Sequence, residues 1–288
     1  MRRISALFTA LALLSSAGCQ SSPPAAAATA SPSPTLIPTA SQTASLVALT
    51  ATPTQSLTPV PSSTPALSPV SSPLDSVSLA DLGKIVSNPF DLPAPGHDDG
   101  HHGTDFAYYR WGERVGMLGL PVHSVFDGQV AAVVVNRPPY GNMVILETNW
   151  SALPPGVRGL LGSPLPPTPR PGDIRLTCPG FFSFPAGAAG QPSLYLLYAH
   201  MQEPPQLHVG DPIASGAQIG KVGTTGASVN PHLHLETRVG PPGATFPGLS
   251  HYIATATDAE MEGYCTWRVS GVFAMLDPLV VLHAAQTN

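Results

Sequence analysis

Short apolar runs separated by turn residues dominate the chain beyond residue 75. One run covers 121–126 and the next covers 129–135, with the tight-turn dipeptide Asp127-Gly128 between them. Similar runs follow at 142–148, 194–201, 218–222 and 233–239. Such runs are typical of β-hairpins, and no segment shows a helical period of comparable strength. The pattern predicts an all-β fold, an antiparallel β-sandwich or barrel, in which the fully apolar run at 194–198 is buried on both faces.

Two stretches interrupt this pattern, at about 149–193 and about 240–270. The first is rich in Pro and Gly, and the second has no regular alternation of apolar and polar residues. We predict irregular loops for both, and loops this long usually serve binding or gating. Cys178 lies in the first insertion and Cys265 in the second.

The N-terminal part of the chain has a different composition, with no charged residue between Arg3 and Asp75. Residues 1–18 combine two arginines, a short apolar stretch and small residues, which is the layout of a secretory signal peptide. The apolar stretch is too short for a membrane span. Small residues directly before Cys19 resemble the bacterial lipoprotein processing site, which implies acylation of Cys19; ordinary cleavage and release of a secreted protein is the alternative.

Residues 19–75 are mostly Ser, Thr, Pro and Ala, a composition with too little apolar mass for a core. We predict a disordered tether here, followed by one folded domain over 76–288. A tether agrees with a lipid anchor on the extracytoplasmic face of a membrane. If Cys19 carries lipid, Cys178 and Cys265 remain as an even pair, for which we predict a disulfide in an oxidising compartment.

The formal net charge of −5 argues against a nucleic-acid partner. The sequence does not define an oligomeric state.

Three short motifs contain the residue types that a metallohydrolase needs. They are His101-His102-Gly103-Thr104-Asp105, Tyr198-Ala199-His200, and Pro231-His232-Leu233-His234-Leu235-Glu236. In a strand, residues two apart point to the same face, so His232 and His234 project together and can supply one metal ligand and one neighbouring base. With His101 and Asp105 this gives three protein ligands, two nitrogens and one carboxylate oxygen. Zinc bound in this way keeps a position open for water, whose proton a neutral histidine can accept.

The motifs HHGTD, YAH and HLHLE, together with PVHSVFDGQV, YGNMVIL and LDPLVVL, resemble the LytM/lysostaphin-type zinc endopeptidases of bacterial cell walls. The resemblance covers about 96–282 apart from the two insertions. It implies a β-sandwich of the duplicated-hybrid-motif type that hydrolyses peptide bonds in peptidoglycan stem peptides or cross-bridges. The alternative is a non-catalytic module that binds the cell wall and activates a separate wall hydrolase.

The resemblance also assigns roles to individual residues. It implies one Zn²⁺ held by His101, Asp105 and His234, with His200 and His232 activating the water and stabilising the oxyanion. The register selects His101 rather than His102 as the ligand. Gly103 lies where a side chain would crowd the backbone near the metal.

Overall fold

The computed structural model describes residues 70–94, 97–162, 177–183 and 191–287. All of these residues belong to one compact unit. The predicted signal peptide, Cys19 and the tether as far as residue 69 lie outside the described residues. Within the described residues, no helix has the length and apolar character needed to cross a membrane.

Eight strands in the described part of the chain form one sheet, and every pairing in it is antiparallel. Seven of them follow the spatial order β1 (Val86–Asn88), β2 (Thr104–Phe106), β11 (Leu233–Gly240), β8 (Ser193–Ala199), β7 (Gly141–Thr148), β6 (Gly128–Arg137) and β9 (Pro212–Ile213). The eighth, β12 (Ala274–Leu276), also pairs with β11. Two-stranded sheets join β5 (Pro121–His123) to β10 (Gln218–Lys221) and β3 (Arg110–Trp111) to β4 (Arg114–Val115). The prediction of an all-β antiparallel fold is confirmed.

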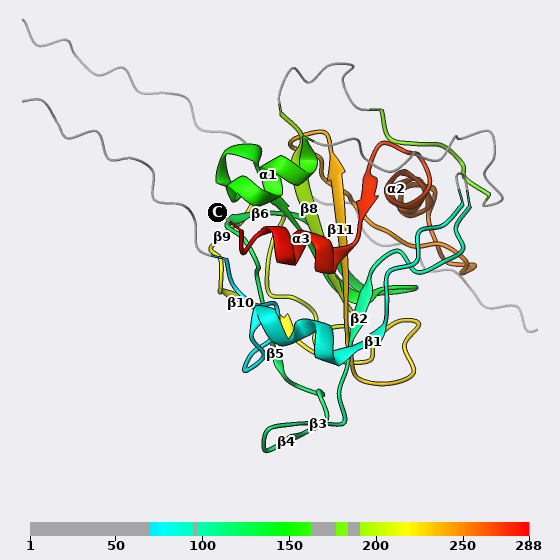
Figure 1. The fold of residues 1–288 in the computed structure, drawn as a ribbon. Helices are drawn as coiled ribbons and strands as arrows, with labels where there is room; N and C mark the ends of the chain where they lie inside the picture. Colours follow the sequence, from blue (N-terminus) through cyan, green and yellow to red (C-terminus); the bar gives the residue numbers. More distant parts are fainter. Residues whose placement is uncertain (1–69, 95–96, 163–176, 184–190, 288) are drawn as a thin grey trace, which may run out of the picture. The chain divides into compact units, whose positions relative to one another are not determined.

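The central strands β7, β8 and β11 are buried along their whole length. Leu196 and Tyr198 of β8 belong to one apolar cluster, whereas Tyr195 and Leu197 belong to another. The first cluster includes α1 (Pro155–Leu161), α3 (Pro278–Ala284) and η1 (Leu79–Ile85), and the second includes α2 (Asp258–Arg268) (Figure 1). Both faces of β8 are therefore covered, which confirms the prediction from its uninterrupted apolar run.

The prediction that both insertions are irregular was wrong, because each contains helical structure. The first holds η2 (Trp150–Ala152) and α1, and the second holds α2. A capping box begins α2, in which the Thr257 side chain accepts from the Glu260 N–H and the Glu260 side chain accepts from the Thr257 N–H. These two bonds satisfy amide groups that the first helical turn would leave without partners.

A disulfide joins the two insertions. Cys178 and Cys265 have an S–S distance of 2.11 Å and a Cα–Cα distance of 6.0 Å, although they are 87 residues apart in sequence. Cys265 lies in α2, so the bond fixes the segment 177–183 against that helix.

The folded part of the chain begins earlier than we predicted. Leu74 is 1% exposed and forms an isolated β-bridge with Val122, and the Ser71 N–H donates to the Val125 carbonyl. Residues 70–75 therefore pack on the domain. The boundary at 75 rested on the first charged residue, but burial of Leu74 does not depend on charge.

Candidate metal centre

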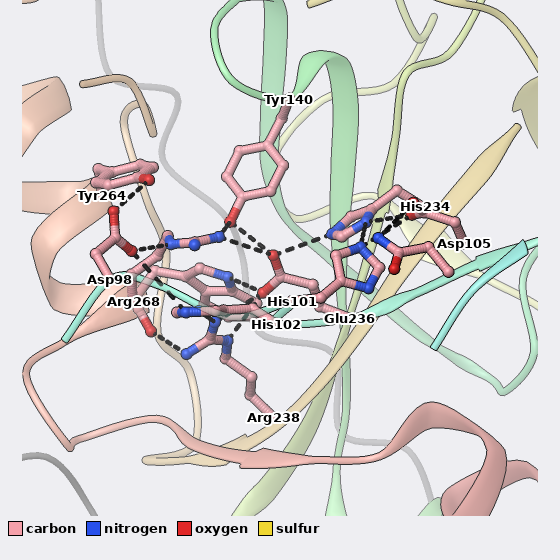
Figure 2. Close-up of polar contacts among 12 residues, drawn as sticks. Asp98, His101, His102, Asp105, Tyr140, His234, Glu236, Arg238, Tyr264 and Arg268 are labelled. Atoms are coloured by element: carbon pink, nitrogen blue, oxygen red, sulfur yellow. Dashed lines mark hydrogen bonds and ion pairs between the residues drawn. The ribbon is translucent and has the colours of Figure 1, made fainter. Parts of the chain in front are cut away.

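Three donor atoms from the first and third motifs meet where β2 pairs with β11. His101 Nε2 lies 3.2 Å from His234 Nδ1 and 3.2 Å from Asp105 Oδ1, and the last two atoms are 2.8 Å apart (Figure 2). Within the described residues, these three side chains form the one group of His, Cys, Asp or Glu arranged to hold a metal ion. The structure therefore brings together the three predicted ligands.

Strand register explains why Asp105 and His234 meet. They are directly opposed on β2 and β11, and antiparallel neighbours place opposed side chains on the same face. Gly103 lets the first motif approach β11, because a Cβ at this position would lie 2.4 Å from the Leu235 carbonyl oxygen. Any larger residue would push the segment between His101 and Asp105 away from β11.

Each of the four histidines at the site has one ring nitrogen that points away from the ligand cluster. A hydrogen bond from this nitrogen orients the ring. His101 Nδ1 donates to the Pro89 carbonyl at 2.8 Å, and His234 Nε2 donates to Glu236 Oε1 at 3.2 Å. The other nitrogen of each ring, His101 Nε2 or His234 Nδ1, is thereby left with its lone pair toward the ligand cluster. Bonds of this kind fix the tautomer of a metal-binding imidazole and raise its basicity.

His200 and His232 lie beside the ligand cluster, with a ring-centroid separation of 4.7 Å. Their Nδ1 atoms donate to the carbonyls of Thr225 at 2.7 Å and Asn230 at 2.8 Å. In the neutral rings, Nε2 therefore carries the lone pair, and His232 Nε2 lies 3.6 Å from Asp105 Oδ1.

His200 adopts a left-handed backbone conformation, with φ of 61°. This conformation is uncommon for a residue other than glycine. It directly follows β8, and its N–H donates to the Tyr140 carbonyl while its side chain bonds Thr225. The surrounding contacts hold His200 in a conformation that turns its ring toward the pocket.

The five predicted site residues line one pocket with a volume of about 410 Å³. They are His101, Asp105, His200, His232 and His234. Tyr140 and Arg268 also line this pocket.

The polar row on β11 continues beyond the two motif histidines. We define the polar row as His232, His234, Glu236 and Arg238, which alternate with residues of the apolar core such as Leu233 and Leu235. Glu236 is completely buried and accepts from Tyr140 OH at 2.7 Å and from Trp267 Nε1 at 2.8 Å. The Arg238 guanidinium donates to Glu236 Oε2, the oxygen that also accepts from Trp267, at 2.8 and 3.0 Å.

The charges of this row control its protonation. Burial alone would raise the pKa of Glu236, but Arg238 and the other cationic neighbours hold it well below its usual range. Burial alone would lower the pKa of His234, but its hydrogen bonds to Asp105 and Glu236 outweigh burial and raise it to about 9. The carboxylates of Asp105 and Glu236 thus favour a positive charge at His234, which either a proton or a bound cation can supply.

The net pKa shift has the opposite direction at two other histidines, where the effect of burial prevails. It lowers the pKa of His200 to about 3, with the neighbouring His234 adding to the effect. It also lowers the pKa of His102 to about 2, together with the charges of Arg268 and Arg238. His102 Nδ1 accepts from Arg238 Nη2 at 2.9 Å, so this residue supports the polar row, as expected for the histidine that the register did not select as a ligand.

The donor set fits Zn²⁺. Two imidazole nitrogens and one carboxylate oxygen are ligand types that zinc takes in catalytic sites, where a fourth position is left to water. The lone pairs of His101 and His234 are already directed at a common point by their far-side hydrogen bonds, and the carboxylate of Asp105 supplies negative charge there.

Residues 188–244 match the model of peptidase family M23. This segment contains His200, His232 and His234. The resemblance to the LytM/lysostaphin-type peptidases is confirmed by this match. The match supports a peptidase function for this site, because the matched segment contains the histidines of the second and third motifs. No curated protein matches the chain significantly.

Solved structures of peptidases also resemble the chain. The catalytic domain of lysostaphin from Staphylococcus simulans is 17% identical, with 72% of this chain and 99% of that chain covered and a TM-score of 0.35. The catalytic domain of the M23 protein EnpA from Enterococcus faecalis, in a mutant form, is 20% identical, with 62% and 92% covered and a TM-score of 0.32. A zinc-containing peptidase from Vibrio cholerae is 20% identical, with a TM-score of 0.31; 60% of this chain is covered, but the match spans only 36% of that chain.

Several residues around the centre had no role predicted from the sequence. These are Asp98, Tyr140, Glu236, Arg238 and Arg268. The HLHLETR stretch did contain a signal for two of them, since its alternation extends the histidine face to Glu236 and Arg238.

Proposed function

We propose that the protein is a zinc-dependent endopeptidase that hydrolyses peptide bonds in bacterial peptidoglycan stem peptides or cross-bridges. The observation that carries this proposal is the meeting of His101, Asp105 and His234 in one pocket with His200 and His232. The M23 match supports the peptidase part of the proposal. The choice of peptidoglycan rests on the resemblance to cell-wall peptidases.

Zinc held by the three ligands would polarise the scissile carbonyl and lower the pKa of its water to about 7. The chain's own contribution lies in His200 and His232, whose Nε2 lone pairs are free because Nδ1 of each ring donates to a carbonyl. Of the two, His232 would accept the proton of the attacking water, since burial lowers the pKa of His200 and keeps that ring neutral. The protonated ring then donates to the oxyanion or to the leaving amine.

We further propose that the protein acts outside the cytoplasm, anchored by lipid on Cys19 and reaching the wall through the tether. The Cys178–Cys265 disulfide supports an exported protein, since such bonds persist in oxidising compartments. Release as a secreted protein is the alternative.

The test measures bound zinc and fragment release from purified peptidoglycan for four proteins. These are the wild type, His234→Ala, His232→Ala and His208→Ala, the last of which changes a side chain that is 90% exposed. We expect one zinc and cleavage in the wild type and in His208→Ala. His234→Ala should lose zinc and activity, and His232→Ala should keep zinc and lose activity.

A wild type that binds no zinc and cleaves nothing would refute the enzyme and favour the wall-binding alternative. That alternative predicts that the protein without zinc still binds peptidoglycan and stimulates a separate wall hydrolase.

A further inference from the structure

The last residue of α2, Arg268, connects two of the segments that build the metal centre. Its Nε forms an ion pair with Asp98, and its Nη1 donates to Tyr140 OH at 3.2 Å. Nη1 also lies 3.6 Å from Glu236 Oε1. Arg268 belongs to the second insertion, beyond the residues that match the M23 family.

On one side, Arg268 holds the segment that leads into the first motif. Asp98 is three residues before His101, and its carboxylate also accepts from Tyr264 OH at 2.9 Å and Tyr252 OH at 2.8 Å. Arg268, Tyr264 and Tyr252, the three partners of Asp98 named here, all come from the second insertion. Figure 2 shows the Arg268 guanidinium between Asp98 and Glu236, with Tyr264 beside Asp98.

On the other side, Arg268 faces the carboxylate that orients His234. Glu236 Oε1 accepts from His234 Nε2 and from Tyr140 OH, the hydroxyl that Arg268 also contacts. Trp267, the neighbour of Arg268 in α2, donates to Oε2 of the same carboxylate. The end of α2 therefore contacts Glu236 through two consecutive residues.

Two buried carboxylates require a cation at the position of Arg268. Asp98 and Glu236 have side chains that are 8% and 0% exposed, and the Arg268 side chain between them is 12% exposed. Loss of a buried cation leaves the buried carboxylates with too little compensating charge, and their side chains must move toward other partners. This movement would disturb the segment before His101 and the hydrogen bond to His234.

We propose that Arg268 is a positioning residue of the metal centre, which acts on His101 through Asp98 and on His234 through Glu236. This inference rests on the proposed zinc site. It gives the second insertion a role in metal binding, although the insertion contributes none of the three ligands.

A matched control exists in Arg137, which anchors the same helix at its other end. Its guanidinium donates to Glu260 at 2.6 and 2.7 Å, and to the Thr255 carbonyl at 2.8 Å. In the part of the chain that the structure describes, these partners of Arg137 include none of the three ligands. A change that only loosens α2 should therefore affect Arg137 and Arg268 variants alike.

The experiment compares the full-length wild type with Arg268→Gln, Arg268→Lys and Arg137→Gln. Zinc affinity is measured by competition with a chromogenic chelator, and thermal melting is measured in the absence of metal. Loss of a residue that orients metal ligands typically weakens metal binding about 10–100-fold, and we expect this loss in Arg268→Gln. Arg137→Gln should lower the melting temperature and keep the zinc affinity of the wild type.

Arg268→Lys should recover part of the affinity, because it restores the charge but cannot contact Asp98 and Tyr140 with a planar group. Equal zinc affinity in the wild type and both Arg268 variants would overturn the inference. The same holds if Arg268→Gln and Arg137→Gln lose zinc affinity equally. A wild type without zinc would instead refute the proposed function, so the two failures are distinguishable.

Discussion

Glu236 Oε1 lies 3.2 Å from His234 Nε2, while Asp105 Oδ1 lies 2.8 Å from Nδ1 of the same ring. One imidazole is thus held between a carboxylate in the pocket and a carboxylate under α2. The second carboxylate is as buried as any residue of the core, so its role is to orient the ring and balance the arginines.

The first prediction concerns Glu236→Gln. The amide can still accept from His234, but it removes the negative charge that faces Arg238 and Arg268. Breaking a buried ion pair costs about 3–5 kcal/mol, and we expect a loss of stability in this range. Zinc affinity should also fall, by about tenfold.

Chemical denaturation and chelator competition measure these two effects of Glu236→Gln. Glu203→Gln is the control, because it changes an exposed carboxylate and should leave both quantities unchanged. If Glu236→Gln has the same free energy of unfolding as the wild type, this carboxylate does not balance the charges of Arg238 and Arg268.

A second prediction concerns the close approach at Gly103. In Gly103→Ala the added Cβ meets the carbonyl oxygen of Leu235 at 2.4 Å, so the first motif or β11 must shift. Overpacking of this kind costs about 1–3 kcal/mol, and here it should also separate Asp105 from His234 and weaken zinc binding.

Gly83→Ala is the matched control, since a Cβ at that position has nothing within 4 Å. Melting curves and zinc titrations should distinguish the two alanine variants. Equal zinc affinity in both would contradict the close-approach argument.

A third prediction concerns the pH dependence of the α2 anchor. The hydrogen bond from Arg137 lowers the pKa of Glu260, with a smaller contribution from the Thr257 N–H. A lowered pKa in the folded state means that Glu260 stabilises the fold above its ordinary pKa, and that this stability is lost as the pH falls through the folded-state value.

Glu260→Gln should therefore be less stable than the wild type at pH 7, by about 1 kcal/mol for a partly exposed charged hydrogen bond. The difference should shrink at about pH 3, where protonation begins to neutralise the wild-type side chain. Paired melting curves at the two pH values measure it, and a difference that does not change with pH would refute the charge effect.

The fourth prediction concerns the disulfide. It closes a long loop between residues 87 positions apart, and loss of such a bond typically costs about 2–5 kcal/mol. The double variant Cys178→Ala/Cys265→Ala should unfold at lower denaturant concentration than the wild type. Reductant should destabilise the wild type and have no effect on the variant; equal stability of the two proteins without reductant would contradict the prediction.

The strands and the ligand set could be predicted from the sequence because both depend on local patterns. Alternation at 233–239 specifies a strand with one polar face, and the first motif places His101 and Asp105 at a fixed spacing. Register then completes the centre, as Asp105 opposite His234 demonstrates. The pairing of β2 with β11 is long-range, and before the structure it was implied by the resemblance to a known family.

The second insertion was harder to predict for two physical reasons. Five consecutive residues of α2, from Gly263 to Trp267, are buried, so the helix has no single apolar stripe. Its capping signal at Thr257 and Glu260 was the available clue. The pair of Arg268 and Asp98 spans 170 residues, and no local pattern indicates which buried arginine meets which carboxylate.

The alternation of β11 links folding directly to metal binding. A shift of one residue in the pairing of β11 would turn Leu233 and Leu235 toward the pocket and bury His232 and His234 among apolar side chains. Such a molecule could retain a sheet of similar size, but it would have no ligand at the position opposite Asp105. Under the proposed function, the zinc content of a purified sample would therefore count the molecules in which β11 has paired in the correct register.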